Sequence, residues 1–169
     1  ALTVVGDQFQ SGEVFLPELM LAGDAAQQVS RHVEAAIVAQ GKVSEPKGVV
    51  VIGTVQGDIH DIDKNIVVTM LKAHGFKVVD LGRNVAPSGF LTAAQANNAD
   101  VVAMSSLMTT TRPMVENTMS LFNEVGARGD HKIIIGGGCV TEDWASTVGA
   151  DGYSPDAVGA VELCKRFSA

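Results

Sequence analysis

From residue 48 onward, short runs rich in Val and Ile alternate with longer stretches whose apolar residues recur at helical spacing. This alternation is typical of β–α units arranged around a parallel sheet. Three of the expected helices open on Pro, which suits the first helical turn. The pattern predicts the α/β class with a doubly wound, five-stranded parallel sheet. Strands are expected at 48–54, 76–81, 101–105, 132–136 and 151–154, and helices at 63–74, 87–98, 113–125, 141–148 and 155–167.

The first forty or so residues follow a different pattern. Between residues 14 and 38 the apolar positions recur at helical intervals, and Gly23 interrupts them, which predicts a pair of helices. Residues 41–47 read GKVSEPK and show no periodicity. We therefore expect a helical domain over 1–42 and an α/β domain over 43–169. The chain begins in mid-pattern without an initiator methionine, so further sequence is expected to complete the helical domain.

Composition excludes several classes of function. The chain carries a net charge of −7 and offers no basic stripe for phosphates, so nucleic acid is not expected as a partner. No apolar stretch is long enough to span a membrane, and no membrane association is expected. Cys139 and Cys164 do not stand in a zinc-ligand spacing, which favours reduced, inert thiols and a cytoplasmic protein.

Ligands of a doubly wound sheet bind at the carboxyl ends of the strands. Function is therefore expected in the loops after strands one, three and four. The first of these loops, at 55–65, reads VQGDIHDIDKN. The chain has no G-x-G-x-x-G after this strand and no G-K-[ST], so dinucleotide and nucleotide-phosphate sites have little support. A phosphorelay receiver would need an Asp at the end of strand three, where this chain has Ser105.

The loop after strand one does offer a histidine two residues after an aspartate. A neutral imidazole is the commonest metal-binding side chain, and a carboxylate on its other ring nitrogen fixes the tautomer. Asp58 and His60 are candidates for that pair; alternatively, Asp58 is a turn residue and His60 a solvated side chain. One histidine cannot build a zinc site, which takes several protein ligands. A metal held by His60 must therefore bring its other ligands with it.

A corrin macrocycle does so, because it supplies the equatorial nitrogens of cobalt. At this point the sequence resembles the cobalamin-binding domain of methionine synthase and, more closely, the corrinoid proteins of anaerobic methyltransferase systems. These families share the motifs D-x-H-x-x-G, S-x-L and G-G at similar separations. The matching segments are Asp58-Ile59-His60-Asp61-Ile62-Asp63, then 41 residues, Ser105-Ser106-Leu107, then 28 residues, and Gly136-Gly137. The resemblance covers nearly the whole chain and departs from the motif at Asp63, where the families have Gly.

The resemblance implies a flavodoxin-like, cobalamin-binding fold. In it His60 would displace the dimethylbenzimidazole base and become the axial cobalt ligand, the base-off/His-on state, with Asp58 and Thr111 completing a relay to His60. The freed nucleotide tail would insert along the sheet edge, where Gly136 and Gly137 permit close approach; alternatively, these glycines form a plain tight turn. The residues of the α/β domain expected to contact the corrinoid are Gly57, Asp58, Ile59, His60, Asp61, Ile62, Asp63, Ser105, Leu107, Thr109, Gly136 and Gly137.

The segment from Phe15 to Met20 resembles part of the helical cap that covers the upper face of the corrin in these families. By this resemblance Phe15, Leu16 and Met20 would contact the corrinoid and shield a reactive methyl group from solvent. The alternative is that these side chains form the core of the helical pair itself. The family cap has more helices than the two expected here.

Asp63 precedes a predicted helix, and Asp is a favoured N-cap that also tolerates positive φ. We expect that Asp63 caps this helix and leaves the His60 loop competent. The alternative is that its carboxylate crowds the corrinoid and weakens binding.

By resemblance, the chain is a methyl carrier that is not catalytic alone. It would take a methyl group on cobalt from a substrate-specific methyltransferase and pass it to a second, methyl-accepting methyltransferase, with a reductive activator as a further partner. Two alternatives stay open: the cobalamin-binding subunit of an adenosylcobalamin-dependent mutase, which usually lacks the cap, and a cobalamin-dependent sensor module. The identity of the methyl donor belongs to the partner enzyme, and the sequence does not determine it.

Overall fold

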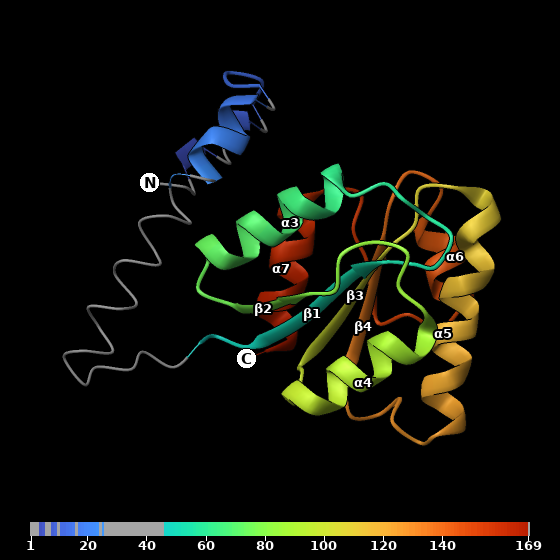
Figure 1. The fold of residues 1–169 in the computed structure, drawn as a ribbon. Coiled ribbons are helices and arrows are strands. Elements are labelled where there is room, and N and C mark those ends of the chain that lie inside the picture. The colour runs from blue at the N-terminus through green and yellow to red at the C-terminus, as the bar shows by residue number, and fades with distance from the viewer. Residues whose placement is uncertain are drawn as a thin grey trace.

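A computed structural model describes residues 46–168 and, nearer the N-terminus, residues 4–5, 8–9, 11–15, 17–23 and 25. Its centre is a five-stranded sheet in the order β2-β1-β3-β4-β5, with every pair of neighbours parallel (Figure 1). This order reverses direction between β1 and β3, as in flavodoxin-like folds. The predicted fold class, a doubly wound five-stranded parallel sheet, is confirmed.

The elements lie close to the expected positions. The strands are β1 (Val49–Thr54), β2 (Lys77–Asp80), β3 (Val101–Ser105), β4 (Lys132–Gly136) and β5 (Gly152–Tyr153). The helices are α3 (Ile62–Ala73), α4 (Pro87–Asn97), α5 (Arg112–Glu124), α6 (Glu142–Thr147) and α7 (Ala157–Phe167), with a short 3-10 turn, η1 (Thr109–Thr111). Two helices do not open on the expected Pro: α5 begins at Arg112, one residue before Pro113, and α7 begins at Ala157, after Pro155. Asp156 is its N-cap, and its carboxylate accepts the N–H of Gly159 at 2.8 Å.

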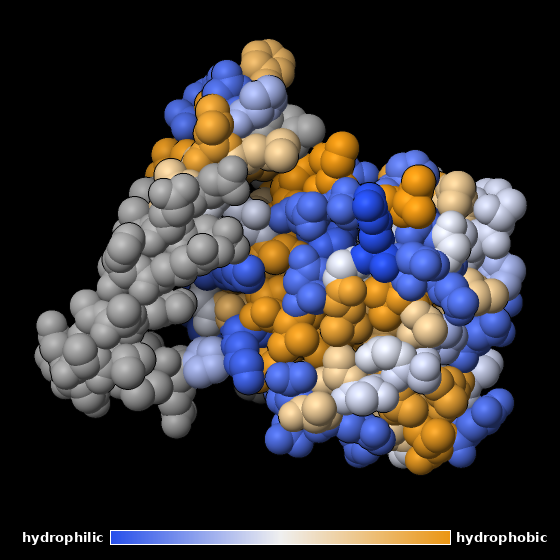
Figure 2. All heavy atoms as spheres, in the orientation of Figure 1, coloured by the Kyte–Doolittle hydropathy of each residue, from blue (hydrophilic) through white to orange (hydrophobic). Residues whose placement is uncertain are grey.

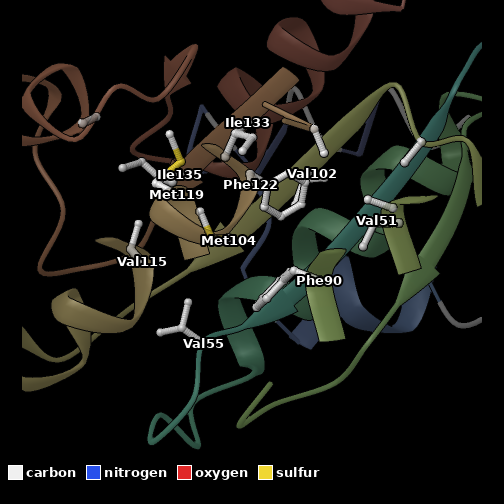
Figure 3. Packing of buried hydrophobic residues seen from close by; sticks show 14 of the residues in the cluster. Val51, Val55, Phe90, Val102, Met104, Val115, Met119, Phe122, Ile133 and Ile135 are labelled. Atoms are coloured by element: carbon white, nitrogen blue, oxygen red, sulfur yellow. The ribbon is translucent and has the colours of Figure 1, made fainter. Parts of the chain in front are cut away.

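Successive residues of the central strands point to opposite faces of the sheet, and each face has its own core. On one face, Val51, Val102 and Ile135 pack against the buried Phe90 of α4 and Phe122 of α5 (Figure 3). On the other face, the neighbouring strand residues pack against α3 and α7. That second set contains Val50, Ile52, Val101, Ala103, Ile134, Val68, Leu71, Val161 and Cys164. The central strands are therefore covered on both faces, and their carboxyl ends carry the open loops.

The N-terminal part is described only in pieces. Residues 17–23 are helical, and within them Leu19 is buried. Phe15, Met20 and Leu21 are exposed, and Figure 2 shows apolar residues at the surface of this segment. The second expected helix and most of the expected boundary at 41–47 lie outside the described residues. Within the described parts of the chain, no helix is both long and apolar enough to cross a membrane.

The packing of α5 generates a stability prediction. Phe122 is fully buried, whereas Val125, at the end of the same helix, is 51% exposed. Phe122→Ala should lower the free energy of unfolding by about 3–5 kcal/mol, because it leaves a cavity in the core. The control Val125→Ala should change it by less than about 0.5 kcal/mol. Urea denaturation followed by circular dichroism measures both, and equal losses would contradict the assignment of Phe122 to the core.

Candidate functional site

The loop after β1 is held against the carboxyl edge of the sheet. The N–H of Val55 donates to the carbonyl of Ser105 at 3.0 Å, which extends the pairing of β1 with β3. Gly57 takes a φ of +84°, which glycine adopts without strain. The buried Thr54 hydroxyl donates to the carbonyl of His60 at 2.8 Å. These contacts fix where the loop leaves the sheet and where it returns.

The Asp58 side chain joins this loop to the loop after β3. Asp58 is fully buried, and its Oδ1 accepts the backbone N–H of His60 at 3.0 Å and lies 2.7 Å from His60 Nδ1. Its Oδ2 accepts the N–H of Leu107 at 2.7 Å and the hydroxyl of Thr111 at 3.3 Å. Both carboxylate oxygens are thus satisfied, which offsets the cost of burying the charge.

These donors also set the charge state of the carboxyl group. Burial acts to raise the pKa of Asp58, but the N–H groups of Leu107 and His60 and the His60 ring outweigh it. The net effect holds the pKa of Asp58 below its ordinary value of 3.8. An ionised carboxylate has no proton to give, so His60 Nδ1 is the donor in their contact. In the neutral ring this leaves Nε2 with its lone pair free.

His60 is placed where a ligand can reach it. Its side chain is 49% exposed although the carboxylate behind it is fully buried. An imidazole held at one nitrogen by a carboxylate and open at the other is the usual arrangement of a metal-binding histidine. The structure therefore brings together Asp58 and His60 as the sequence predicted. The pair is suited to supply one axial bond to a metal that carries its other ligands.

The loop after β3 contributes two buried hydroxyl groups. Thr111, at the end of η1, lies with its Oγ1 2.8 Å from Ser106 Oγ and donates to the carbonyl of Met108 at 2.8 Å. Ser106 is fully buried, and the sequence analysis had given it no role. Its neighbour Ser105, which was predicted to contact the corrinoid, lines a cavity beside the loop.

The loop after β4 approaches the loop after β3 very closely. Gly137 has a φ of +117°, and a Cβ atom there would lie 2.1 Å from the carbonyl oxygen of Ser106. The glycine is therefore required by the protein's own backbone, whatever ligand binds nearby. Cys139, in the same loop, donates its thiol to the Ser106 carbonyl at 3.3 Å. Cys139 thus helps to hold two site loops together, a role that its lone position in the sequence did not indicate.

A cavity of about 400 Å³ opens beside these loops. It lies between the carboxyl ends of β3, β4 and β5 and the first turns of α3 and α7. Ser105, Gly136, Gly137 and Gly138 line it together with Tyr153 and Ser154 of the β5 end. Functional loops were expected only after strands one, three and four, whereas the end of β5 also lines the cavity.

The structure corrects the role predicted for Asp63. The N-cap of α3 is Asp61, and it makes no side-chain capping bond. Asp63 lies inside the first turn of the helix, with ordinary helical backbone, so it neither caps the helix nor needs a positive φ. The prediction failed because the helix begins at Ile62, before the Asp rather than after it. The exposed side chain of Asp63 instead lines the cavity.

Within the described part of the chain, the other predicted residues lie around this centre without a polar side-chain contact to Asp58 or His60. Ile59 and Ile62 are 66% and 58% exposed on either side of His60. Thr109 is exposed at the start of η1, and Asp61 approaches Arg83 at 3.9 Å. In the N-terminal part, Phe15 and Met20 are exposed, whereas Leu16 lies outside the described residues.

The loop after β2 supports the site and was missed. The side-chain carbonyl of Asn84 accepts the N–H of Gly57 at 2.8 Å, and the N–H of Asn84 donates to the carbonyl of Asp58 at 3.1 Å. Asn84 holds a φ of 56°, which Asn tolerates better than most residues. The segment LGRN follows a strand that ends on the same sheet edge, and that position was the available signal.

The described residues contain no cluster of three or more His, Cys, Asp or Glu side chains arranged to hold a metal ion.

Comparisons with known proteins agree with this chemistry. The family profile of the B12 binding domain matches residues 48–162, and a second B12 binding domain profile matches residues 1–34. Dimethylamine corrinoid protein 1 of Methanosarcina acetivorans is 43% identical over 167 residues, which are 98% of this chain and 77% of that protein.

Two solved structures are similar over nearly the whole chain. A cobalamin-binding protein from Desulfitobacterium hafniense has 36% identity and a TM-score of 0.79, over 98% of this chain and 77% of that one. A chain of the methanol:cobalamin methyltransferase complex from Methanosarcina barkeri has 32% identity and a TM-score of 0.87, over 99% of this chain and 63% of that one. The chain therefore belongs to the B12-binding family and is a corrinoid protein of the kind found in methyltransferase systems.

Proposed function

We propose that this chain holds a corrinoid in the base-off/His-on state and carries a methyl group between two methyltransferases. The observation that carries the first part is the 2.7 Å contact between His60 Nδ1 and the buried Asp58 carboxylate. That contact leaves Nε2 as a free lone pair on a half-exposed ring, which is the donor that an axial site requires. A bound corrinoid would supply the cobalt chemistry of methyl transfer, and the protein would supply ligation, orientation and exclusion of water.

The cavity supports insertion of a nucleotide tail. Ser105 lines it with a small side chain and Gly136 and Gly138 line it with backbone alone, and a Cβ atom at Gly138 would meet no other atom within 4 Å. The space is therefore kept open at a position where the backbone does not demand glycine. In this proposal the displaced base and its ribose phosphate occupy the cavity between the ends of β3, β4 and β5.

The described and matched parts of the chain support two domains. We infer that residues 43–169 form the corrinoid-binding domain and that residues 1–42 belong to a helical cap. The second B12 binding domain profile over residues 1–34 supports the cap, as do the exposed apolar side chains of Phe15 and Met20. Facing a bound corrin, these side chains would lose their exposure to water. Leu16 is included in the cap by its position between them.

The remaining predicted contacts follow if the corrinoid is bound over His60. Ile59 and Ile62 are exposed apolar side chains that flank His60, and they suit contact with the apolar edge of a corrin. Thr111 would act through Asp58, and the backbone N–H of Leu107 also bonds Asp58 while its side chain would contact the cofactor. Gly57 shapes the loop. Asp61 and Thr109 would lie at the periphery of the bound group.

The relatives favour a methyl carrier over a mutase subunit or a sensor. Similar proteins are named dimethylamine corrinoid proteins, and a similar structure is part of a methanol:cobalamin methyltransferase complex. We propose a substrate-specific methyltransferase as methyl donor, a second methyltransferase as acceptor and a reductive activator as a further partner. The relatives act in systems with different methyl donors, so the donor of this chain is best identified by assays with candidate partner enzymes.

The axial-ligand proposal predicts the effect of removing the imidazole. Reconstituted with hydroxocobalamin, the protein should show the visible spectrum of a base-off/His-on corrinoid, and His60→Ala should lose it. The control His74→Ala, at the end of α3, should keep the spectrum, because the His74 imidazole bonds only the carbonyl of Met70 among the described residues. An unchanged spectrum in His60→Ala would exclude His60 as the cobalt ligand.

The lowered pKa of Asp58 predicts that the stability of the folded protein depends on pH. The folded-state pKa of Asp58 is depressed, so its contribution to stability is present in full above the ordinary value of 3.8 and is lost as pH falls through the folded pKa. Asp58→Asn should therefore lower stability at neutral pH and flatten the decline of stability below pH 4. It should also weaken corrinoid binding by about 10 to 100-fold. Urea titrations at several pH values measure the first effect, and parallel acid limbs in the two proteins would contradict it.

Tail insertion predicts that filling the cavity discriminates between two corrinoids. Gly138→Val should weaken binding of cobalamin more than binding of cobinamide, which lacks the nucleotide. Gly137 is unsuitable for this test, because a side chain there would collide with Ser106 in any state. Gly129→Val is the matched control, since Gly129 is exposed, has equally open space and does not line the cavity. Equal losses for both corrinoids in Gly138→Val would count against an inserted tail.

A further inference from the structure

We propose that Asp63 is a specificity-determining residue that opposes entry of the anionic nucleotide tail into the cavity. This inference rests on the proposed insertion of the tail. It concerns the one motif position where the chain has an acid in place of glycine. As a consequence, Asp63 lowers the affinity of the chain for corrinoids that carry a nucleotide tail. It leaves the affinity for corrinoids without a tail nearly unchanged.

The charges that line the cavity are unbalanced. Asp63 and Asp156 both line it, and Lys64 is the only cation among its described lining residues. The Lys64 ammonium is already engaged, because it lies 2.7 and 2.8 Å from the two carboxylate oxygens of Asp80. Lys64 is also 97% buried, so it has little freedom to turn toward a ligand. A phosphodiester entering the cavity would therefore meet two carboxylates and no free cation among these residues.

The two acids differ in what they do for the protein. Asp156 is committed to the N-cap of α7, where it accepts the N–H of Gly159 at 2.8 Å. The Asp63 carboxylate accepts no hydrogen bond and forms no ion pair within the described residues. Its side chain is exposed at the cavity, so its charge is not consumed by a structural contact.

The position of Asp63 at the start of α3 places its negative charge next to the cavity. Asp63 lies in the first turn of the twelve-residue helix α3, whose N-terminal N–H groups carry partial positive charge. With glycine there, this helix end would favour a phosphate placed in the adjoining cavity. The Asp63 carboxylate makes no hydrogen bond to these N–H groups within the described residues, but it places a full negative charge beside their partial positive charge and so offsets its attraction for a phosphate. The acid thus competes with the tail for the electrostatic field at the start of α3.

Two substitutions separate charge from bulk. Asp63→Asn removes the charge and keeps the shape, whereas Asp63→Gly removes both. We expect both variants to bind hydroxocobalamin about threefold to tenfold more tightly than the natural sequence, as fits the size of helix-end charge effects. Binding of cobinamide should change by less than twofold, because it has no phosphate. Asp130→Asn changes the net charge equally in the loop before β4, at the opposite edge of the sheet, and should alter neither affinity.

Ionic strength gives a second, independent readout. The advantage of Asp63→Asn over the natural sequence for cobalamin should shrink toward one as salt rises, since exposed charges are screened. Equilibrium titrations followed by visible absorption, at low and high salt, measure both corrinoids. Unchanged cobalamin affinity in Asp63→Asn would overturn the proposal, and a gain seen only in Asp63→Gly would assign the effect to bulk instead.

The test also distinguishes this inference from the function on which it depends. If Gly138→Val weakens cobalamin selectively and Asp63→Asn has no effect, the tail inserts but Asp63 does not oppose it. If Gly138→Val affects both corrinoids equally, tail insertion itself fails. A gain in cobinamide affinity equal to that for cobalamin would show that Asp63 acts on the corrin ring, and would also overturn the proposal.

Discussion

One buried carboxylate organises the candidate site. Asp58 accepts hydrogen bonds from both sides of the switch point, with His60 in the loop after β1 and Leu107 and Thr111 in the loop after β3. Without these donors the Asp58 carboxylate would be too costly to bury. Without the carboxylate, the loops after β1 and β3 would have no shared hydrogen-bond acceptor. The orientation of the imidazole is therefore a consequence of the same bonds that close the edge of the sheet.

The third loop is tied to this centre by backbone shape rather than by charge. Gly137 lets the loop after β4 lie against the Ser106 backbone, and the Cys139 thiol bonds the same residue. Ser106 thus contacts Thr111, which bonds Asp58, through its hydroxyl, and contacts the loop after β4 through its carbonyl. The same loop also borders the cavity, where Gly138 has no neighbouring atom to avoid. Adjacent glycines therefore serve different purposes, one internal to the protein and one at the cavity.

The sequence was sufficient for the sheet because its central strands are covered on both faces and read as continuous Val and Ile runs. It was sufficient for the pairing of Asp58 with His60 because both residues lie in one short loop. The roles of Ser106 and Asn84 could not be predicted from the sequence, because their contacts form only when loops that are distant in the sequence come together. Asp63 was misplaced because helix starts carry an uncertainty of a residue or two. One such shift moved its side chain from a capping role to the wall of the cavity.

The hydroxyl groups behind Asp58 leave one hydrogen bond adjustable. The single proton of Thr111 has two acceptors within reach, the carbonyl of Met108 at 2.8 Å and Asp58 Oδ2 at 3.3 Å. If Thr111 donates to Met108, its oxygen can accept from Ser106, and Oδ2 keeps only the N–H of Leu107. If Thr111 turns to Asp58, the Met108 carbonyl is left with the Ser106 hydroxyl at 3.5 Å. Because no heavy atom has to move, the strength of the carboxylate's hold on the imidazole can vary with one hydroxyl rotation. The backbone N–H groups of His60 and Leu107 nevertheless hold Asp58 in place, so Thr111 adjusts the contact between Asp58 and His60 without being needed to build it.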